Sequence, residues 1–438
     1  MKILIISEYI APLQSIASVR WTKIAKYIRA AHPEAEITVL TDQKEFGPGG
    51  QKKDVLLERD MAAFHRYWQV PKGRRMKLYE ALKHQNAGQV QSAEQTAYSQ
   101  SPVQPALLKR ELLLAVRDEK ERISYSQTMA FLKDKTLDFD VIVSTYGPAW
   151  PHLVAERIKK RCPRAVWIAD FRDPYAKHTD APLAFRRHDR FVRRHCAAAD
   201  VLTKVLDSLY INEPAGARVE VVTNGYDPAE RRPSLPPRRF DLVFTGTLYG
   251  EKTDLGVFFR LLRELKEEGV LDEEHARLVY AGGQGREALA MAKKQGAEAF
   301  LEDKGVLARQ QAFALQQSAA VLLQTGWNEA RAQCMWTGKT YEYMMTGKPI
   351  AYVVTGDMPH SLPAQNIHRL GGVCYEQCRH EETYPALKGY ILEKYQEWKR
   401  TGEVTIRRDE AYVAGYSYQR IAEQVWRLME EKRAQGRS

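Results

Sequence analysis

Hydrophobic and polar positions along the first 45 residues predict a strand, a helix and a second strand. Residues 2–7 form a short apolar run, which is typical of a buried strand. Residues 19–31 carry apolar side chains at helical spacing, and residues 36–41 return to a strand pattern. This order predicts the opening β-α-β unit of a doubly wound parallel sheet.

The same alternation continues on both sides of a stretch rich in proline and arginine, residues 228–239. We therefore predict two Rossmann-like α/β domains, at 1–227 and 240–415, with 228–239 as the linker. Residues 416–438 are predicted to form a closing helix. Residues 46–137 are polar and break the rhythm, so we interpret them as a helical, basic insertion, with one helix near 60–68.

In a doubly wound sheet, ligands bind at the carboxyl ends of the strands, and the first such loop spans residues 11–20. Ser15, Ser18 and Arg20 are candidates there for an acceptor or phosphate loop. The loop lacks a G-x-G-x-x-G sequence, which argues against a tightly bound dinucleotide. The alternative is a plain connection with a capping serine.

Charged residues follow the predicted strand at 165–170. Charges at the end of a buried strand are costly unless they pair or bind a ligand, so we expect Asp170, Arg172 and Asp173 to face a substrate. The alternative is a structural Asp–Arg pair. His152 begins a helix near the same edge, where an ordinary helix-start histidine is the competing interpretation.

The stretch 337–350 combines a Thr-Gly turn, about two turns of helix, a glycine stop and a return to an apolar strand. A helix that starts on such a turn offers unpaired N–H groups and a positive dipole end to a phosphate. Glu342 falls one turn into this helix and could accept hydrogen bonds from sugar hydroxyls. The alternative is an ordinary surface helix with a glycine C-cap.

Four motifs follow one another in the second half of the chain: Thr245-Gly-Thr-Leu-x-x-x-Lys252, Gly282-Gly283, Gly305-Val-Leu307 and Gly338-Lys-x-Tyr-Glu-Tyr-x-x-x-Gly-Lys-Pro349. Their order and spacing resemble the GT-B glycosyltransferases, and in detail their family 4-type branch. The resemblance implies two Rossmann-like domains facing a central cleft, with the C-terminal helix closing back on the first domain. It also implies retaining transfer without a metal or other cofactor, from a donor substrate such as a UDP- or GDP-sugar.

The resemblance also assigns roles to residues. Lys252 would neutralise the donor diphosphate, and Glu342 would hold the donor ribose as the second glutamate of an E-x7-E motif. Cys334 stands where that motif has its first glutamate, and Glu329 is a possible replacement. The predicted donor-binding residues are Gly246, Thr247, Lys252, Gly282, Gly283, Gly305, Val306, Leu307, Gly338, Lys339, Thr340 and Glu342. The predicted catalytic residues are Asp170, Arg172, Asp173, Lys252 and Glu342.

Charge and composition add an expected partner. The formal charge of the 438 residues is +11, which suggests an anionic one. Residues 66–77 hold five basic residues and two aromatic ones, so we predict membrane docking through Trp68, Lys72, Arg74 and Arg75; the alternative is a solvated basic loop. Nucleic acid is not expected, because no aromatic platform accompanies the charge.

The cellular setting follows from what the sequence lacks. No apolar run approaches the roughly 18 residues of a membrane span, and five scattered cysteines do not suggest a disulfide framework. Cys374, Cys378 and His380 are too loosely spaced to predict a metal site. We expect a cytoplasmic protein with peripheral contact at the inner face of the cell membrane.

These observations predict a glycosyltransferase that passes a sugar from a nucleotide-sugar to a glycan or lipid-linked acceptor in bacterial surface glycan assembly. Two alternatives remain open: a nucleotide-sugar 2-epimerase of the same fold, and an inactive nucleotide-sugar or glycan-binding protein. The departure at Cys334 motivates the second alternative.

Overall fold

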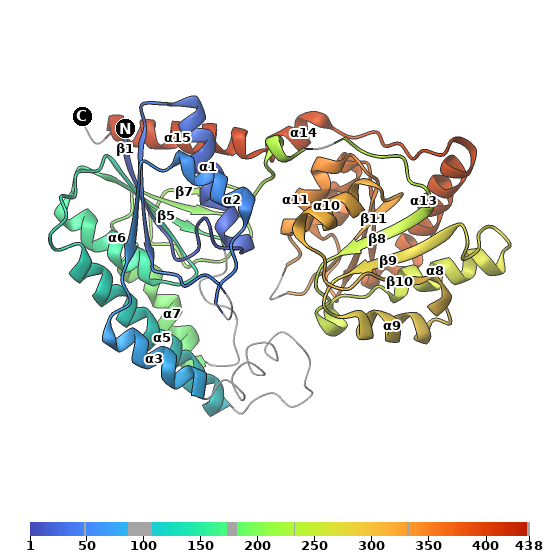
Figure 1. The fold of residues 1–438 in the computed structure, drawn as a ribbon, viewed down its shortest axis with the longest axis horizontal. Helices are drawn as coiled ribbons and strands as arrows, with labels where there is room; N and C mark the ends of the chain where they lie inside the picture. The colour runs from blue at the N-terminus through green and yellow to red at the C-terminus, as the bar shows by residue number, and fades with distance from the viewer. Residues whose placement is uncertain (48–49, 86–106, 173–181, 232, 331–332, 436–438) are drawn as a thin grey trace. The chain divides into compact units, whose positions relative to one another are not determined.

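The computed structural model describes residues 1–47, 50–85, 107–172, 182–231, 233–330 and 333–435. These residues form two compact units, each built on a parallel sheet (Figure 1). The first unit contains the described residues up to Gly225 together with those from Tyr418 onward, and the second contains Tyr226–Ser417. The chain therefore returns to the first unit at its end.

The first sheet has seven parallel strands in the order β3-β2-β1-β4-β5-β6-β7. Its order reverses between β1 and β4, which is the topological switch point of a doubly wound sheet. The strand interiors are almost entirely apolar, as expected for strands covered on both faces. The strands are β1 (Lys2–Ile6), β2 (Glu36–Asp42), β3 (Arg66–Val70), β4 (Val141–Thr145), β5 (Val166–Phe171), β6 (Val201–Lys204) and β7 (Val219–Val221).

Alternate strand residues face two helical layers. On one face, Ile3, Val39 and Ile168 pack beneath α1 (Ile16–Ala31) and α15 (Tyr418–Gln435). The opposite face carries Leu4, Ile142 and Trp167 and is covered mainly by the helices at 107–131 and 150–161. The remaining helices of this unit are α2 (Val55–Asp60), η1 (Met61–Ala63), α3 (Arg74–Gln85), α5 (Leu107–Phe131), α6 (Trp150–Arg161) and α7 (Pro182–His195).

The predicted helix at 60–68 is wrong. The segment holds the end of α2, the short helix η1 and the edge strand β3, which pairs with β2 from Thr38↔Arg66 to Asp42↔Val70. Polar Arg66 and Gln69 flank the aromatic residues of β3, so the strand lacks the apolar run that marked its neighbours. Residues 46–137 are consequently not only a helical insertion, because they also complete the sheet.

The second unit has six parallel strands in the order β10-β9-β8-β11-β12-β13. Its strands are β8 (Phe240–Thr245), β9 (Ala276–Ala281), β10 (Leu301–Asp303), β11 (Val321–Trp327), β12 (Ile350–Thr355) and β13 (Val373–Glu376). Its helices are η2 (Pro228–Glu230), η3 (Gly250–Lys252), α8 (Gly256–Glu267), α9 (Gly285–Lys294), η4 (Glu298–Phe300), α10 (Arg309–Gln317), α11 (Gly338–Thr346), α12 (Leu362–Asn366), η5 (Ile367–Leu370), η6 (Gln377–Arg379), α13 (His380–Thr401) and α14 (Glu410–Gly415). Buried Phe258, Phe259 and Leu262 of α8 anchor one side of the core.

The segment predicted as a linker is held against the second unit. Backbone Leu235 N–H donates to the carbonyl oxygen of Gln317, and Gln317 Nε2 donates to Pro233 O at 2.8 Å. The ammonium of Lys348, which is 2% exposed, also donates to the carbonyl oxygen of Leu235. Burial lowers the pKa of Lys348 to about 8. These contacts make the segment part of the second unit rather than a free tether.

Candidate functional site

The loops after β8 and β9 touch at the carboxyl edge of the second sheet. A Cβ atom on Gly282 would lie 2.1 Å from the carbonyl oxygen of Gly246, so only glycine fits there. Tyr280 OH donates to the same oxygen at 3.2 Å. The neighbouring Gly283 lies beside Val306, whose side chain is 80% exposed. The edge is therefore a close-packed backbone surface with an apolar side chain beside it.

Lys252 lies at the carboxyl ends of β11 and β12. Its ammonium is 3.3 Å from Glu329 Oε2 and 5.3 Å from the centre of the Trp327 ring. Its carbonyl oxygen accepts a hydrogen bond from Thr355 Oγ1 at 3.0 Å. The side chain of Lys252 is 48% exposed, so its charge is accessible to an anion at this edge.

Helix α11 begins at Gly338 behind a capping residue. Thr337 is the N-cap, and its side chain and that of Thr340 form a reciprocal capping box. Gln324 Nε2 fixes the Thr337 hydroxyl from β11 at 2.6 Å. The N–H groups of Gly338 and Lys339 lie in the first turn, ahead of the hydrogen-bond ladder of the helix. This end of α11 therefore presents donors and the positive end of the helix dipole.

Glu342 is held from two sides in the second unit. Lys339 Nζ donates to Glu342 Oε2 at 2.7 Å, and Gln316 Nε2 reaches the same oxygen at 3.3 Å. Gln316 Nε2 also donates to Thr245 Oγ1 at 2.8 Å, which links α10 and α11 to the end of β8. Within the described residues, the buried Oε1 atom of Gln316 has no hydrogen-bond partner. Gln316 is fully buried and positions Glu342, whose partly exposed carboxylate is the acceptor that a ligand hydroxyl can meet.

A hollow adjoins Glu342 and Gln316. It has about 20 Å³ of free space, roughly the room for one water molecule. Its lining comes from η2, α10 and α11, and comprises Glu230, Phe313, Gln316, Gln317, Glu342, Met345 and Thr346. A hollow of this size is a small side pocket next to Glu342.

Cys334 lies inside the second unit rather than at this edge. It is 6% exposed, its backbone N–H donates to Asn328 Oδ1 at 2.9 Å, and its sulfur lies 3.9 Å from Tyr352 OH. Burial raises the pKa of its thiol to about 12, so the thiol is protonated at neutral pH. The position where the E-x7-E motif has its first glutamate therefore carries a neutral, buried thiol in this chain.

The other predicted donor residues follow the same strand ends. Thr247 is exposed just after Gly246, and Leu307 is half-buried. Gly305 has φ +61°, a left-handed conformation that glycine adopts without strain. Thr340 is fully buried, so it contributes to the helix cap rather than a direct contact. Their role in donor binding stays a prediction.

In the first unit, Asp170 and Arg20 form a buried ion pair. Arg20 donates to Asp170 from Nε at 3.0 Å and from NH2 at 2.8 Å, and its other donors reach carbonyl oxygens at Val222 and Thr223. Asp170 also accepts from Trp21 Nε1 at 2.7 Å. Burial raises the pKa of Asp170, but the Arg20 guanidinium lowers it by more. The pKa of Asp170 is therefore below its ordinary value. The structural Asp–Arg pair of the alternative interpretation is therefore present, and a direct role of Asp170 or Arg20 toward a substrate stays a prediction.

The remaining first-unit candidates also have structural contacts. Arg172 donates to the carbonyl oxygens of Tyr146 and Gly147 at 3.1 and 2.8 Å, so it braces the loop after β4. Ser15 is the N-cap of α1, as the alternative interpretation held. Buried Ser18 Oγ has no hydrogen-bond partner among the described residues. Asp173 lies outside the described residues.

His152 is buried rather than poised at the edge. Its Nδ1 lies 2.7 Å from Ser144 Oγ, and its ring packs 4.8 Å from that of Phe171. Trp167 Nε1 donates to the same Ser144 oxygen, so we assign the Ser144 hydroxyl proton to His152 Nδ1. Burial lowers the pKa of His152 to about 3, which keeps the ring neutral.

Sequence reasoning missed a charged cluster at the carboxyl ends of β1 and β2. Glu8, 4% exposed, accepts from Lys120 at 2.8 Å and from Trp150 Nε1 at 2.9 Å, with Lys44 at 3.7 Å. Burial raises the pKa of Glu8, but the positive charges of Lys120 and Lys44 lower it by more than burial raises it. The pKa of Glu8 is therefore below its ordinary value. Glu8 directly follows the first strand, so the rule that singled out Asp170 could have found it. Lys120 had no such signal, because it lies on α5 within the presumed insertion.

Two of the four predicted membrane residues have contacts within the first unit, and the other two are exposed. Trp68 is half-buried and packs edge-on against Phe139, so it belongs to the core of the first unit. Lys72 is paired with a carboxylate of α3 at 2.9 Å. Arg74 and Arg75 are exposed at the start of α3. No described helix is both long enough and apolar enough to cross a membrane.

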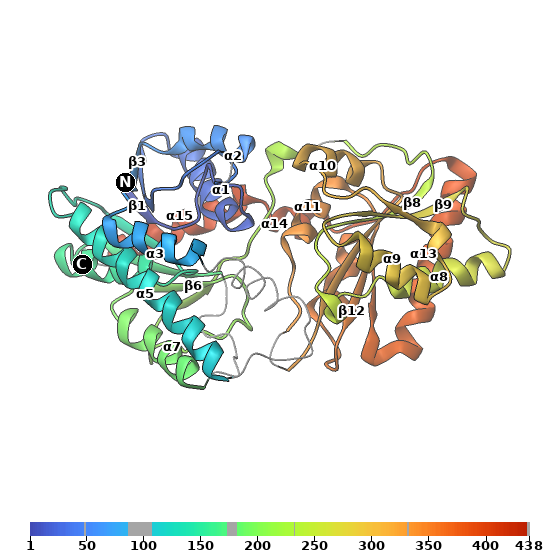
Figure 2. The same ribbon diagram turned by 60° about the horizontal axis from the view of Figure 1, so that its bottom comes forward.

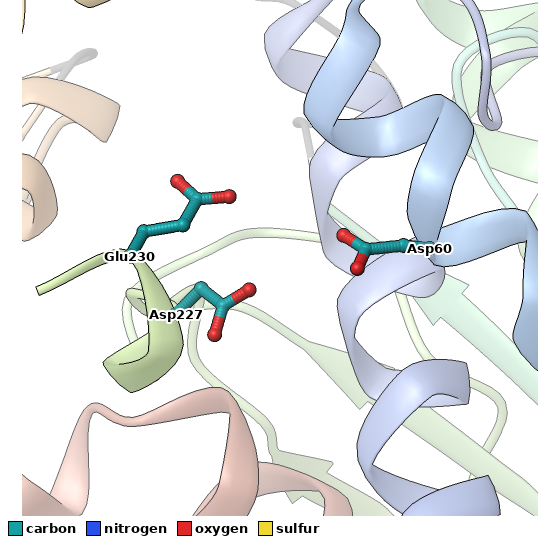
Figure 3. Close-up of side chains that lie close together, drawn as sticks. All are labelled: Asp60, Asp227 and Glu230. Atoms are coloured by element: carbon teal, nitrogen blue, oxygen red, sulfur yellow. The ribbon is translucent and has the colours of Figure 1, made fainter.

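Three carboxylates drawn in Figure 3 each have a partner within their own unit. Asp60 pairs with Lys23 at 2.6 Å. Asp227 caps η2 by accepting from a backbone N–H at 2.9 Å, and Glu230 pairs with Arg309 at 3.0 Å. Because these contacts explain the carboxylates as structural groups, we assign no metal to them.

Comparisons with known proteins address the fold. No protein-family model matches the chain, and no curated protein does. Among solved structures, the lipopolysaccharide outer core galactosyltransferase WaaB is 12% identical with a TM-score of 0.53, over 97% of this chain and 98% of that one. An E. coli structure described as trehalose-6-phosphate bound with UDP-2-fluoro glucose is 13% identical with a TM-score of 0.61. The match covers 98% of this chain and 99% of that one. The α,α-trehalose-phosphate synthase (UDP-forming) of Burkholderia xenovorans, in complex with glucose-6-phosphate, is 12% identical with a TM-score of 0.54. The match covers 98% of this chain and 100% of that one.

The chain has the GT-B fold. Two parallel sheets of seven and six strands, each flanked by helices, match these structures along nearly their whole length. The predicted fold class is thereby confirmed. Identities of 12–13% carry the likeness no further than the fold.

Proposed function

We propose that this protein is a glycosyltransferase that moves a sugar from a nucleotide-sugar to a glycan or lipid-linked acceptor. The observation that carries the proposal is the carboxyl edge of the second sheet. There an accessible Lys252, the start of α11 and Glu342, which Gln316 holds in place, lie on neighbouring strand ends and helices. Transferases with the same fold support this reading.

In this proposal the donor diphosphate lies against Lys252 and the first turn of α11. The leaving nucleotide gains negative charge as the glycosidic bond breaks, and fixed positive groups stabilise that charge more than the ground state. Lys252 supplies a full charge, while the N–H groups of Gly338 and Lys339 supply dipoles without reorganisation. We propose that these groups suffice without a metal ion.

The nucleoside is proposed to use the glycine edge and Glu342. Val306, exposed beside Gly283, offers an apolar contact to a base, and Glu342 offers its carboxylate to ribose hydroxyls. A UDP- or GDP-sugar has all of these parts. We further propose retaining transfer, a role in bacterial surface glycan assembly, and a cytoplasmic location at the membrane.

The buried Cys334 supports a second candidate, a nucleotide-sugar-binding protein without transferase activity. A neutral thiol inside the unit cannot contact a transferred sugar. Glu329 lies 3.3 Å from the Lys252 ammonium, and we propose that it takes over the sugar contact. The 2-epimerase alternative has no observation of its own in this structure.

A paired binding and turnover experiment tests the proposal. A thermal-shift panel of UDP- and GDP-sugars should raise the melting temperature of the native protein with at least one of them. Lys252→Ala and Glu342→Ala should weaken that shift and reduce donor turnover by 100-fold or more, about 3 kcal/mol of transition-state stabilisation. Lys293→Ala, on the exposed face of α9, is the matched control.

The outcomes separate the candidates. Wild-type turnover in both site variants contradicts the assigned site. A strong shift with no transfer and no donor hydrolysis favours the binding protein. Epimerised nucleotide-sugar formed without an acceptor favours the 2-epimerase. In Glu329→Gln, a loss of turnover with an unchanged thermal shift supports the sugar contact.

A further inference from the structure

Helix α7 carries an arginine-rich face. Five of its arginines, Arg186, Arg187, Arg190, Arg193 and Arg194, are exposed, and Val192 is fully buried. At about 100° per residue, the five arginines fall within an arc of roughly 120° centred opposite Val192. The helix therefore presents one strongly basic face to its surroundings.

Ion pairs among the described residues neutralise little of the charge on this face. Arg187 pairs with Asp118 of α5. Among the described residues, no ion pair involves Arg186, Arg190, Arg193 or Arg194. The single acid of the helix, Asp189, lies at the edge of the arc, where its carboxylate accepts from Tyr210 OH at 2.8 Å. Four like charges gathered in this way repel one another unless an anionic surface neutralises them.

An exposed leucine lies among these arginines. Leu183 is 69% exposed and falls in the middle of the same arc. On the first unit, α3, α5 and α7 run as neighbours (Figure 2), and α3 carries exposed Leu78 beside Arg75. A basic helical face with an aliphatic residue at its centre suits a lipid interface, where headgroups meet the charges and the apolar side chain enters the acyl boundary.

We propose that the α7 face docks the protein onto an anionic lipid bilayer. The occupant is a membrane rather than a nucleic acid, because the face lacks exposed aromatic side chains for base stacking among its described residues and has a leucine at its centre. The inference deepens the proposed function, since a lipid-linked acceptor is reached at such a surface. The proposed membrane contact is therefore centred on α7 rather than on Trp68, which is half-buried against Phe139.

Vesicle co-sedimentation of the full chain tests this proposal without any donor or acceptor. The probes are phosphatidylcholine vesicles with and without phosphatidylglycerol. We expect binding only to the anionic vesicles. With three fewer charges, at about 1 kcal/mol each, the R186Q/R190Q/R194Q variant should bind on the order of 100-fold more weakly. The control K293Q/K294Q/R400Q loses the same charge from exposed positions of the second unit and should bind as the wild type does.

A second variant distinguishes a bilayer from other polyanions. Leu183→Asn keeps the charge and should reduce vesicle binding several-fold while leaving heparin binding unchanged. Equal losses in the α7 triple variant and the control, or no loss in either, overturn the proposal. Loss of vesicle binding only in R186Q/R190Q/R194Q, with a wild-type melting temperature, supports it. Donor turnover measured without vesicles reports on the proposed function separately, so failure of one does not imply failure of the other.

Discussion

At the scale of single residues, burial decides which charged groups are structural. Asp170 and Arg20 are 150 positions apart in sequence, and no local pattern shows that they satisfy one another. Lys252 and Glu342 are each partly exposed, and the structure keeps them at strand and helix ends where a ligand can reach them. The sequence located charges at strand ends correctly. It could not show which of them already had partners.

The buried His152 makes stability depend on pH. Its pKa falls from 6.5 to about 3 on folding, so between these values the unfolded chain binds the proton more readily. The free energy of unfolding should therefore fall as the pH is lowered from 7 to 5, by about 2 kcal/mol from this residue. Urea denaturation at both pH values measures the difference.

The matched variant is His152→Asn, whose amide oxygen can still accept from Ser144. It should be less stable at both pH values because it fills less space, but it should lose less stability between pH 7 and 5 than the wild type. His368→Asn, at an exposed position, should keep the wild-type difference. An unchanged pH difference in His152→Asn would contradict the assignment of this residue as buried and neutral.

At the scale of elements, apolar runs predicted the central strands, because strands covered on both faces have few polar residues. The edge strands β3 and β13 escaped notice. β3 mixes arginine and glutamine with aromatic residues, and β13 is only four residues long. Helix α11 was predicted closely from its capping threonine and its C-terminal glycine, since both signals are local.

The cap of α11 should link stability to ligand binding. Thr337→Ala removes the acceptor for Thr340 N–H and leaves Gln324 Nε2 without its hydroxyl partner. We expect a loss of about 1–2 kcal/mol in unfolding free energy, together with weaker nucleotide-sugar binding, because the cap fixes the first turn. Thr337→Ser keeps the hydroxyl and should restore both, as measured by denaturation and by thermal shift. Weaker stability with unchanged ligand affinity would separate the cap from the proposed phosphate site.

At the scale of the whole molecule, the first unit is completed by a segment that follows the second unit in sequence. Helix α15 packs on α1 and joins the core formed by β1, β2 and β5. Trp426 of α15 also stacks on His32 at the end of α1, with ring centres 3.7 Å apart. A fold built this way places a residue near position 430 in the same core as residue 3. The first unit therefore cannot reach full stability before α15 is made.

This arrangement predicts that a change in α15 acts on the first unit alone. Met429 is fully buried in that core, so Met429→Ala should cost about 2–5 kcal/mol through lost burial and a residual cavity. Differential scanning calorimetry should show the first unit unfolding at a lower temperature while the transition of the second unit stays in place. Glu430→Ala, exposed on the same helix, should change neither transition. We assign nucleotide-sugar binding to residues 240–415. In Met429→Ala, binding should therefore persist at temperatures where the first unit has already unfolded. Loss of binding together with the first unfolding transition would show instead that the ligand needs both units.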